Sequence, residues 1–357
     1  MEPLTLSRLA VKHTQNAVAE SLYRRTGYDI TKPISFYGVI NEHCNAKCRF
    51  CDYWRLKQYK DEMTIEEWQN ALLSIKEFVG EFFINFSGGE PFIKKGFIDL
   101  LTFCGQNGIH SGVTTNGSRM TRENAQKVVA AHPFNVNFSV DAPNAELHDY
   151  LRGTPGLFAK LSNGIRYLRE ESEKQGVKFP IIVKPTINRL NLHLMPQMVE
   201  WAQQVGATTV NFQPLYRWTQ ETNEELWIEE EQYGELIEVL DRLIQMKQEG
   251  ALIMNSEDNL RLILSHFREE KADPKYMPCL VGLRNYFIDS RGDVALCYEY
   301  PPIGNVKDKS AKEIWYGEKA QEVRRQTLAC TKLCLNTCVS QKTLKDKFLM
   351  GLKLLHN

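Results

Sequence analysis

Three cysteines lie close together near the start of the sequence, at Cys44, Cys48 and Cys51. A structural zinc site usually takes four ligands from two separated pairs, so this spacing suits zinc only if a distant fourth ligand joins. An iron–sulfur cluster held by three thiolates leaves one iron atom without a protein ligand, and that iron can bind another molecule. The spacing therefore favours a cluster with one open iron, with zinc or no metal as the alternatives.

A second group of cysteines lies in the last quarter of the chain: Cys279, Cys297, Cys330, Cys334 and Cys338. The cytosol keeps thiols reduced, so we expect metal ligands here rather than disulfides. Cys104 stands alone on the apolar side of an expected helix. A free cysteine packs as a small hydrophobic residue, and Cys104 is predicted to be an ordinary buried thiol.

The composition is that of a globular protein, with 357 residues, 43% of them hydrophobic, and a formal net charge of zero. This length allows one large domain and a smaller one. A balanced charge argues against a protein that follows nucleic-acid phosphates. No apolar run resembles a signal peptide or approaches the ~20 residues that span a bilayer. We therefore predict a cytoplasmic protein that binds neither nucleic acid nor membrane.

Strand and helix patterns alternate between residues 34 and 215, and these elements must position the first cysteines. Strands are expected at 34–40, 82–87, 111–117, 134–141, 179–188 and 207–215. Helices are expected at 64–79, 97–108, 121–131, 156–176 and 192–206. Strands that alternate with helices form a parallel sheet. Six units are fewer than the eight of a closed barrel. The pattern therefore predicts an α/β fold, a partial (β/α)6 barrel with its chemistry at the carboxyl ends of the strands.

The pattern changes after residue 228. Long amphipathic helices are expected at 229–250 and 256–271, and a further helix at 310–328. Two short strands surround the turn "SRGD" within 285–300, which predicts a β-hairpin. We therefore divide the chain into an N-terminal helical extension (1–33), a partial barrel (34–228), and linker helices with a small module built from a β-hairpin plus helices (229–357).

The segment "CNAKCRFC" resembles the C-x3-C-x2-C motif of the radical S-adenosylmethionine (SAM) superfamily, including the aromatic Phe50 before the third cysteine. Further segments resemble this family in the same order: "SGGEP" (87–91), "TTNG" (114–117), "FSVDAP" (138–143) and "HDYLRG" (148–153). The resemblance covers roughly residues 34–215. It implies a [4Fe-4S] cluster held by Cys44, Cys48 and Cys51, with SAM bound to the open iron.

The same resemblance implies a set of SAM-binding residues: Phe50, Gly88, Gly89, Glu90, Asn116, Ser139, Asp141 and Arg152. Part of this follows from the residue types alone. Glycine lets a backbone approach a ligand closely, and the Glu90 carboxylate can bind an ammonium group by a charge-assisted hydrogen bond. His148 and Asp149 are candidates either for the same site or for capping and surface ion pairing.

The late cysteines resemble a SPASM or Twitch auxiliary-cluster module, because a hairpin follows Cys279 and Gly292 stands five residues before Cys297. The cysteines are too few for a full SPASM pattern. The resemblance therefore implies one auxiliary [4Fe-4S] cluster, with the expected ligands Cys279, Cys297, Cys334 and Cys338. Cys330 is then a spare thiol or a catalytic hydrogen-atom donor. A different subset of ligands, and zinc on these cysteines, stay open.

The resemblance also implies the reaction. A reduced cluster donates one electron to SAM, and the products are methionine and a 5′-deoxyadenosyl radical that removes hydrogen from a substrate carbon. Electrons of such low potential are expected from a flavodoxin or ferredoxin. Tyr298 and Glu299 are candidates for acid–base groups, and Lys184 and Arg217 for binding a polar substrate.

Three enzymatic hypotheses follow, together with one that is not enzymatic. The first is oxidation of a small polar molecule such as a sugar or aminocyclitol, with the auxiliary cluster accepting the second electron. The second is modification of a ribosomally made peptide by a crosslink, thioether or epimerised residue. The third is epimerisation in which a late cysteine returns a hydrogen atom. The last is an interaction module that uses its clusters only as structural supports.

Overall fold

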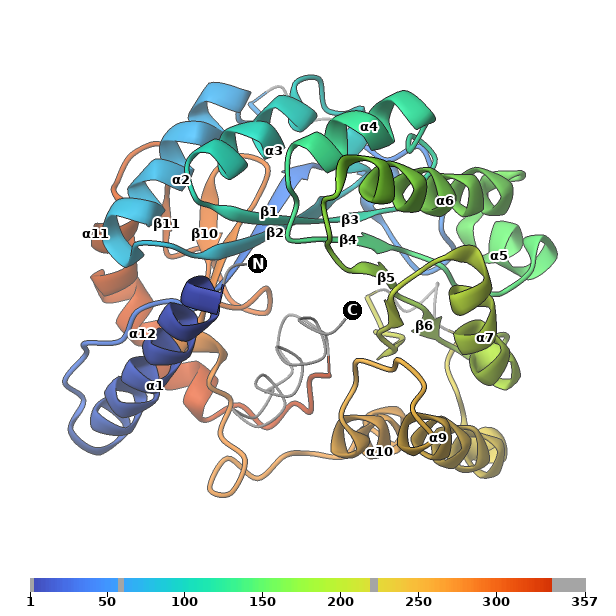
Figure 1. The fold of residues 1–357 in the computed structure, drawn as a ribbon. Coiled ribbons are helices and arrows are strands. Elements are labelled where there is room, and N and C mark those ends of the chain that lie inside the picture. The colour runs from blue at the N-terminus through green and yellow to red at the C-terminus, as the bar shows by residue number, and fades with distance from the viewer. Residues whose placement is uncertain (1–2, 57–60, 219–223, 336–357) are drawn as a thin grey trace.

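The computed structural model describes residues 3–56, 61–218 and 224–335. Helices lie on the outside of a curved sheet that surrounds the centre of the molecule (Figure 1). The strands run in a linear order from β11 at one edge to β7 at the other, so the barrel is open. The core lies between this sheet and its outer helices, where the fully buried Trp68 and Phe86 pack edge to face.

Six parallel strands follow one another both along the chain and across the sheet. They are β1 (Ser35–Asn41), β2 (Phe83–Gly88), β3 (His110–Thr115), β4 (Asn135–Phe138), β5 (Ile181–Val183) and β7 (Thr209–Val210). This order confirms the predicted α/β fold with a partial barrel of six units. Because the strands are parallel, the segments that follow their carboxyl ends meet at one end of the barrel.

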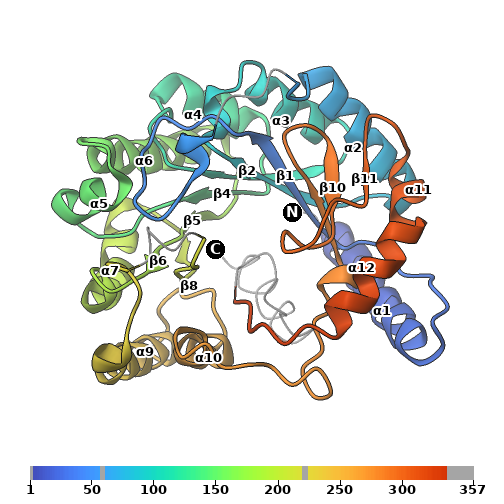
Figure 2. The ribbon, with the colours of Figure 1, turned by 180° about the vertical axis from the view of Figure 1, so that it is seen from behind.

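The helices that connect these strands cover the outer face of the sheet (Figures 1 and 2). They are α2 (Ile65–Val79), α3 (Phe97–Gln106), α4 (Arg122–Ala130), α6 (Leu157–Gln175) and α7 (Met195–Val205). The start of α2 is a capping box. The Thr64 hydroxyl accepts the Glu67 N–H at 3.1 Å, and the Glu67 carboxylate accepts the Thr64 N–H at 2.7 Å.

One short helix, α5 (Ala145–Arg152), is absent from the elements expected from the sequence. It has only eight residues, too few for a clear periodic pattern. Its ends nevertheless carry recognisable signals. The Asn144 side chain accepts the Leu147 N–H at 3.0 Å, and Gly153 ends the helix in the left-handed conformation at φ 57°. This helix places Arg152 beside the cysteine loop.

Two of the expected strands are shorter and are interrupted. Residues 179–188 form β5 and then β6 (Thr186–Ile187), and residues 207–215 form β7 and then β8 (Gln213–Pro214). Pro185 separates β5 from β6, and a proline cannot donate a ladder hydrogen bond. At the second break, Phe212 exchanges its backbone hydrogen bonds with the side chain of Asn255 at 2.8 Å each. β6 and β8 pair with each other in a small separate sheet.

The C-terminal part contains helices α9 (Tyr233–Gln248), α10 (Glu257–Phe267), α11 (Ala311–Tyr316) and α12 (Glu318–Leu328). Its strands are β9 (Asn285–Ile288), β10 (Asp293–Ala295) and β11 (Gly304–Asn305). β9 and β10 pair antiparallel, which confirms the predicted hairpin. Single-turn helices occur at Tyr53–Arg55, Pro91–Ile93, Leu192–Leu194, Glu230–Gln232 and Val281–Leu283.

The hairpin is continuous with the barrel. β9 lies parallel to β1, with pairs that run from Ser35 and Asn285 to Gly38 and Ile288. The division at residue 228 therefore separates two parts of the chain that share one sheet. This pairing holds the hairpin beside the strand that leads into the first cysteine loop.

The N-terminal extension is largely one helix, α1 (Pro3–Thr26), and lies beside α12 in both views (Figures 1 and 2). Arg284 binds both carboxylate oxygens of Glu20 at 2.7 Å each. Arg324 reaches Asp29 at 2.7 Å. These ion pairs fasten the extension to the C-terminal part. No helix within the described ranges is long and apolar enough to cross a membrane.

Candidate active site

The loop that follows β1 carries the first three cysteines. Cys48 is 5% exposed, and Cys44 and Cys51 are partly buried. Burial raises the pKa of Cys44 and of Cys51 to about 11 each, so both are protonated at neutral pH without a metal. Nowhere in the described part of the chain do three His, Cys, Asp or Glu side chains converge as ligands of a single ion. A cubane cluster does not require this, because each thiolate binds a different iron atom.

The end of α5 forms backbone hydrogen bonds with the cysteine loop. The Lys47 N–H donates to the Arg152 carbonyl oxygen at 3.1 Å, and the Arg49 N–H donates to the Leu151 carbonyl oxygen at 2.9 Å. Gly153 allows this contact, because a Cβ there would lie 2.2 Å from the Lys47 carbonyl oxygen. The loop conformation is therefore fixed by backbone hydrogen bonds on both sides of Cys48.

The glycine pair after β2 also lies against this loop. A Cβ on Gly88 would lie 2.3 Å from the Asn41 carbonyl oxygen, and one on Gly89 would lie 2.0 Å from the His43 carbonyl oxygen. The Gly89 N–H donates to the Asn41 carbonyl oxygen at 3.0 Å. From the sequence, we expect these glycines to admit a ligand. In the protein they admit the backbone of the cysteine loop itself, which brings β2 close to the cysteines.

Glu90 is completely buried, and its carboxylate has several protein partners. One oxygen accepts the Thr115 hydroxyl at 2.7 Å and the Phe92 N–H at 3.2 Å, and the other accepts the Asn116 N–H at 2.8 Å. Burial raises the pKa of Glu90 to about 7, although these hydrogen bonds act in the opposite direction. Glu90 therefore joins the ends of β2 and β3. Its contact with the SAM ammonium group stays a prediction.

Arg152 connects Asp141 with the central cysteine. Its Nε lies 2.6 Å from Asp141 Oδ2, and a terminal nitrogen donates to Cys48 Sγ at 3.6 Å. The guanidinium also lies 5.2 Å from the centre of the Phe50 ring. Burial alone would lower the pKa of Arg152, but Asp141 and Cys48 outweigh this effect and raise it. A permanent positive charge therefore lies beside Cys48, where it would stabilise a metal-binding thiolate.

Asp141 is itself held in place from two directions. Its Oδ1 accepts the Thr186 N–H at 3.0 Å, and its own N–H donates to His148 Nδ1 at 3.2 Å. Burial, with a smaller contribution from Arg152, lowers the pKa of His148 well below 6.5. A neutral imidazole can keep Nδ1 as an acceptor. His148 thus orients the segment after β4.

Asp149 caps a helix. Its two carboxylate oxygens accept the N–H groups of Gly156 at 2.6 Å and Phe158 at 2.8 Å, at the start of α6. Of the two readings that the sequence allows for Asp149, the structure fits the capping role.

Asn116 and Ser139 follow the third and fourth strands at the same end of the barrel. The Asn116 amide nitrogen lies 3.9 Å from Cys44 Sγ and donates to Asn45 Oδ1 at 3.0 Å. The Ser139 N–H donates to the Thr115 carbonyl oxygen at 2.9 Å, and its side chain is partly buried. The ends of β1 to β4 and of α5 thus bring together Cys44, Cys48, Phe50, Cys51, Gly88, Gly89, Glu90, Asn116, Ser139, Asp141 and Arg152.

The late cysteines form a second group. Burial raises the pKa of Cys297 to about 11 and that of Cys334 to about 12, and in both cases Cys279 and Cys330 add to the effect. The pKa of Cys279 is also raised, first by burial and then by Cys330. These four thiols therefore lie within electrostatic range of one another, without converging as the ligands of a single ion. Cys330, a candidate catalytic residue from the sequence, thus acts electrostatically on three of the expected ligands, and the fourth expected ligand, Cys338, lies outside the described residues.

Tyr298 and Glu299 follow this group directly. The Tyr298 ring is partly buried and packs against Trp218 at 5.3 Å and Phe287 at 6.4 Å between ring centres. Glu299 is exposed and forms an ion pair with Lys332. Tyr298 is thus placed within an aromatic group, whereas Glu299 lies with the late cysteines at the surface. Their acid–base roles stay predictions.

The two basic residues considered for the substrate have different surroundings. Lys184 follows β5 and is partly buried at the end of the barrel. Arg217 has a side chain that is 44% exposed; it lies 3.6 Å from Glu229 and 3.8 Å from Glu269 and stacks on Trp227 at 4.2 Å. Arg217 is therefore held in a surface network, and the substrate-binding role of both residues stays a prediction.

A set of polar side chains on the barrel strands was not anticipated from the sequence. The Asn137 amide nitrogen donates to Asn85 Oδ1 at 3.2 Å and to Thr114 Oγ1 at 3.3 Å, and the Asn85 amide donates to Thr114 at 3.1 Å. Asn135 joins the set at 3.2 Å. We call these four residues the amide belt. Asparagine is depleted in strands, so its recurrence in the expected strands was the available signal.

An aromatic pair lies on the neighbouring strands. Tyr37 of β1 stacks on Phe287 of β9, with ring centres 4.8 Å apart and planes at 25°. Both residues are partly buried at alternating positions of their strands, as is Asn85, which pairs with Tyr37 in the sheet. Alternation places Tyr37, Asn85 and Phe287 on one face. The two side chains of this pair could not be matched from sequence, because about 250 residues separate them.

The N-terminal site has the features that a SAM-bound iron–sulfur cluster requires. It offers three thiols on one loop, the positive charge of Arg152 beside Cys48, and the amide donor of Asn116 near Cys44. Asn41 also has a buried side-chain oxygen that no hydrogen bond satisfies, next to the glycine pair. The donor set and the local charge thus fit such a group.

Comparison with known proteins agrees with this arrangement. The sequence model of the radical SAM superfamily matches residues 39–193, and that of SPASM, an iron-sulfur cluster-binding domain, matches residues 279–339. The AdoMet-dependent heme synthase of Nitratidesulfovibrio vulgaris is 26% identical over 292 residues, which cover 77% of this chain and 77% of that enzyme. PqqA peptide cyclase of Rhodopseudomonas palustris is 26% identical over 176 residues, covering 49% of this chain and 45% of the cyclase.

Solved structures share the fold. SuiB of Streptococcus suis, bound to S-adenosylmethionine, superimposes with a TM-score of 0.67 and 14% identity, over 86% of this chain and 71% of SuiB. SuiB bound to its precursor peptide SuiA gives 0.66 with 15% identity, over 87% and 72% of the two chains. The two matched modules imply a SAM-binding [4Fe-4S] cluster and auxiliary iron–sulfur binding. The chain is a member of the radical SAM superfamily with a C-terminal SPASM module.

Proposed function

We propose that Cys44, Cys48 and Cys51 are the protein ligands of the SAM-binding cluster. The contact between Arg152 and Cys48 carries this proposal, because it places a buried positive charge against the central thiol. When bound, the cluster and SAM supply a 5′-deoxyadenosyl radical that removes hydrogen from a substrate carbon. The chain's own contribution is to hold the three thiols in a fixed loop at the open end of the barrel.

The other residues at this end divide into two roles under the proposal. Asp141 and Arg152 hold the loop and its charge, and the glycine pair brings the β2 backbone beside it. Phe50, Glu90, Asn116 and Ser139 surround the thiols and supply ring, carboxylate, amide and hydroxyl groups. These groups suit the adenine, ammonium, carboxylate and ribose parts of SAM.

For the auxiliary cluster we favour Cys279, Cys297, Cys330 and Cys334 as ligands. Their mutual effects on pKa support this set, because the electrostatic influence of one thiol on another weakens with distance. Four thiolates complete a [4Fe-4S] cluster. A fully ligated cluster is suited to accepting an electron rather than to binding substrate.

The substrate is proposed to be a polar molecule bound inside the barrel. The amide belt offers uncharged hydrogen-bonding groups on β2 to β4, and the Tyr37–Phe287 pair offers a ring face on the neighbouring strands β1 and β9. We favour net oxidation over epimerisation, because Cys330 lies with the other thiols instead of standing apart as a hydrogen-atom donor. Cys338, which lies outside the described residues, is the other late thiol to test for that role.

Modification of a peptide is a second candidate. The match to PqqA peptide cyclase, at 26% identity over about half of this chain, favours it. The longer match to the AdoMet-dependent heme synthase adds heme precursors to the compounds that should be tested.

The test is anaerobic reconstitution with iron and sulfide, followed by dithionite and SAM. We expect 5′-deoxyadenosine from the native chain and from Cys104→Ala, a control at a buried thiol outside both groups, and none from Cys48→Ala. Absence of 5′-deoxyadenosine from the native chain, or its formation by Cys48→Ala, contradicts the proposal. Deuterated polar alcohols, peptides and heme precursors then identify the substrate class by deuterium transfer into 5′-deoxyadenosine.

A further inference from the structure

The amide belt lies on the inner face of the barrel sheet. Its residues alternate along β2, β3 and β4 with buried side chains that pack under the outer helices, so they point the other way. Asn85, Thr114 and Asn135 are partly exposed, and Asn137 is 5% exposed. The inside of a barrel is usually filled by branched apolar residues. Four polar residues at this level are therefore a feature that the fold alone does not require.

One backbone group fixes the orientation of the Asn137 amide. Its nitrogen donates to the Val113 carbonyl oxygen at 3.1 Å, and a carbonyl oxygen can only accept. The same nitrogen donates to Asn85 Oδ1 and to Asn135 Oδ1 at 3.2 Å each, so both side chains turn their oxygens toward it. The Asn137 oxygen therefore lies on the other side of its amide, and none of the described residues donates a hydrogen bond to it.

Thr114 leaves a donor beside this acceptor. Thr114 and Asn137 are direct partners in the register of β3 and β4. The Thr114 hydroxyl oxygen accepts N–H groups from Asn85 at 3.1 Å and from Asn137 at 3.3 Å. A hydroxyl that accepts twice can still donate once, and the Thr114 hydrogen has no acceptor within the described ranges. The belt thus offers one free acceptor and one free donor on neighbouring strands.

Gly112 makes this arrangement possible. It lies between Asn85 and Asn135 in the register of the sheet. A Cβ at Gly112 would lie 2.3 Å from Asn135 Oδ1 and 2.7 Å from Asn85 Oδ1. The two amide oxygens converge only because this position has no side chain. The belt is therefore organised by the protein before any ligand arrives.

The strand residues level with Asn137 carry no charge. Ile182 and Thr209 continue its register across β5 and β7, and both are uncharged. Lys184 stands two residues beyond Ile182 and belongs to the next level of the barrel. An ionised group buried among neutral side chains lacks a partner of opposite charge, which makes its burial costly. A hydroxyl or an amide satisfies the free acceptor and the free donor without this cost.

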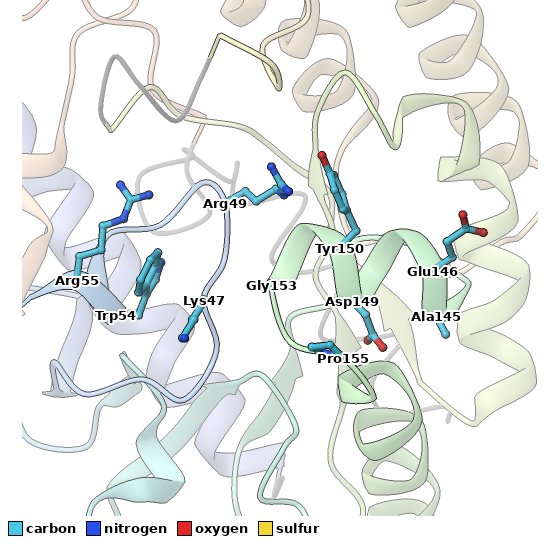
Figure 3. Close-up of a pocket in the computed structure, with 10 residues that line it drawn as sticks. All are labelled: Lys47, Arg49, Trp54, Arg55, Ala145, Glu146, Asp149, Tyr150, Gly153 and Pro155. Carbon is cyan, nitrogen blue, oxygen red and sulfur yellow. The ribbon is translucent and has the colours of Figure 1, made fainter.

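The surface pocket beside the cysteine loop has a different character (Figure 3). It has a volume of about 600 Å³ and lies between that loop and α5. All its lining residues stand outside the barrel strands. Charges of both signs line it, from Lys47, Arg49, Arg55, Glu146 and Asp149. Of these two polar sites, the belt is the uncharged one and the one on the barrel sheet.

The belt also lies next to the residues proposed for SAM. Asn116 and Ser139 follow Thr114 and Asn137 by two residues. Two residues of a strand span about 7 Å, so each pair is separated by one level of the barrel. A substrate group held by the belt would leave the rest of the substrate between the belt and the proposed SAM site.

We propose that Thr114 and Asn137 are specificity-determining residues that bind an uncharged hydroxyl or amide group of the substrate. Carboxylate and ammonium groups are excluded from this position. The inference rests on the proposed function, because a substrate is needed inside the barrel only if a SAM-derived radical forms at its open end. An alcohol of a cyclitol and an amide of a peptide share this chemistry, and the experiment distinguishes them.

The first experiment measures binding to the SAM-loaded holoenzyme by equilibrium dialysis. The neutral probes are myo-inositol and N-acetylglycinamide, and the charged probes are glucuronate, glucosamine and N-acetylglycine. At least one neutral probe should bind with a Kd about tenfold or more below that of its charged counterparts. The neutral probe that binds more tightly decides between alcohol and amide. Equal Kd values for neutral and charged probes, or no binding of either neutral probe, overturn the proposal.

Two variants test the belt itself. Asn137→Ala removes the free acceptor, and Gly112→Ala keeps every belt side chain but displaces the two amide oxygens. Each should raise the Kd of the preferred neutral probe about tenfold, the effect of about one lost hydrogen bond. Asn163→Ala, at an exposed asparagine of α6, is the matched control and should bind as the native chain does. A native Kd in either belt variant overturns the proposal.

The second experiment separates selection from structural support. Asn137→Asp places a carboxylate at the free acceptor, so the Kd ratio between glucosamine and the preferred neutral probe should shift about tenfold in favour of glucosamine. A purely structural role predicts equal losses for both probes, and that result overturns the proposal. Formation of 5′-deoxyadenosine with dithionite and no probe tests the cluster alone. If the native chain forms none, the proposed function fails, and the binding data alone decide the role of Thr114 and Asn137.

Discussion

The guanidinium of Arg152 lies between Asp141, at 2.6 Å, and Cys48, at 3.6 Å. Asp141 is completely buried and Arg152 is 8% exposed, so neither charge can turn to solvent if the other is removed. We expect Arg152→Met to destabilise the apoprotein by about 3–5 kcal/mol, measured by urea unfolding, because it leaves a buried carboxylate without its partner.

A double variant provides the control for this prediction. Asp141→Asn combined with Arg152→Met removes both charges and should recover part of the lost stability. Iron content should stay low in the double variant, because Cys48 still lacks its positive neighbour. Full recovery of iron binding in the double variant contradicts the role given to Arg152.

The ligand set of the auxiliary cluster can be read from iron content. Two [4Fe-4S] clusters hold about eight iron atoms per chain. We expect Cys330→Ala to reduce this to about four, because Cys330 lies with Cys279, Cys297 and Cys334. Cys338→Ala should keep about eight. The reverse result supports the set expected from sequence, with Cys330 as the free thiol.

Gly89 provides a steric test of the cysteine loop. A Cβ at this position would lie 2.0 Å from the His43 carbonyl oxygen, so Gly89→Ala must displace the loop. We expect it to lose the SAM-binding cluster, with about four iron atoms left and no 5′-deoxyadenosine. Gly234→Ala, in α9 with no atom within 4 Å of the added Cβ, should retain both and gain up to about 1 kcal/mol of stability. Normal activity of Gly89→Ala would show that the loop can adapt.

The buried, neutral His148 leads us to expect a loss of folding stability in mild acid. Its pKa in the folded protein is lowered by burial well below the 6.5 of a free histidine, so the unfolded chain takes up the proton first. Stability should therefore fall as the pH drops below 6.5, by about 1.4 kcal/mol per pH unit from this group. Well above pH 6.5, His148 is neutral in both the folded and the unfolded chain, so its titration does not change the free energy of unfolding.

The matched variant for this measurement is His148→Asn, whose amide oxygen can still accept the Asp141 N–H. Its stability in urea between pH 7 and pH 5.5 should decline less steeply than that of the native chain. Identical slopes for the two proteins would assign the acid sensitivity to other groups.

The sequence predicts the barrel well because its signals are local. Strand and helix periods alternate in order, and the capping box at Thr64 marks the start of α2 within one residue. The breaks after β5 and β7 were missed for different reasons. Pro185 was a visible local signal, whereas the partner that ends β7 is Asn255, more than forty residues away.

The candidate site likewise has features that the sequence predicts locally and features that depend on tertiary contacts. The cysteine spacing identifies the loop, but the partners of Glu90 and the position of Cys330 among the late thiols depend on tertiary contacts. The α5 helix could have been predicted from the sequence, because Asn144 and Gly153 are residue types typical of helix boundaries. The parallel pairing of β1 with β9 could not be predicted, because each segment has the pattern of an ordinary strand and neither pattern identifies its partner.

That pairing has a consequence for how the polypeptide can be divided. If the chain were cut after residue 228, β1 would lose β9 and become an outer strand with a row of unsatisfied backbone groups. Such strands recruit other molecules and promote aggregation. An expressed fragment that ends there should precipitate or self-associate, so the SPASM hairpin acts as a protective cover for the barrel in addition to carrying cysteines.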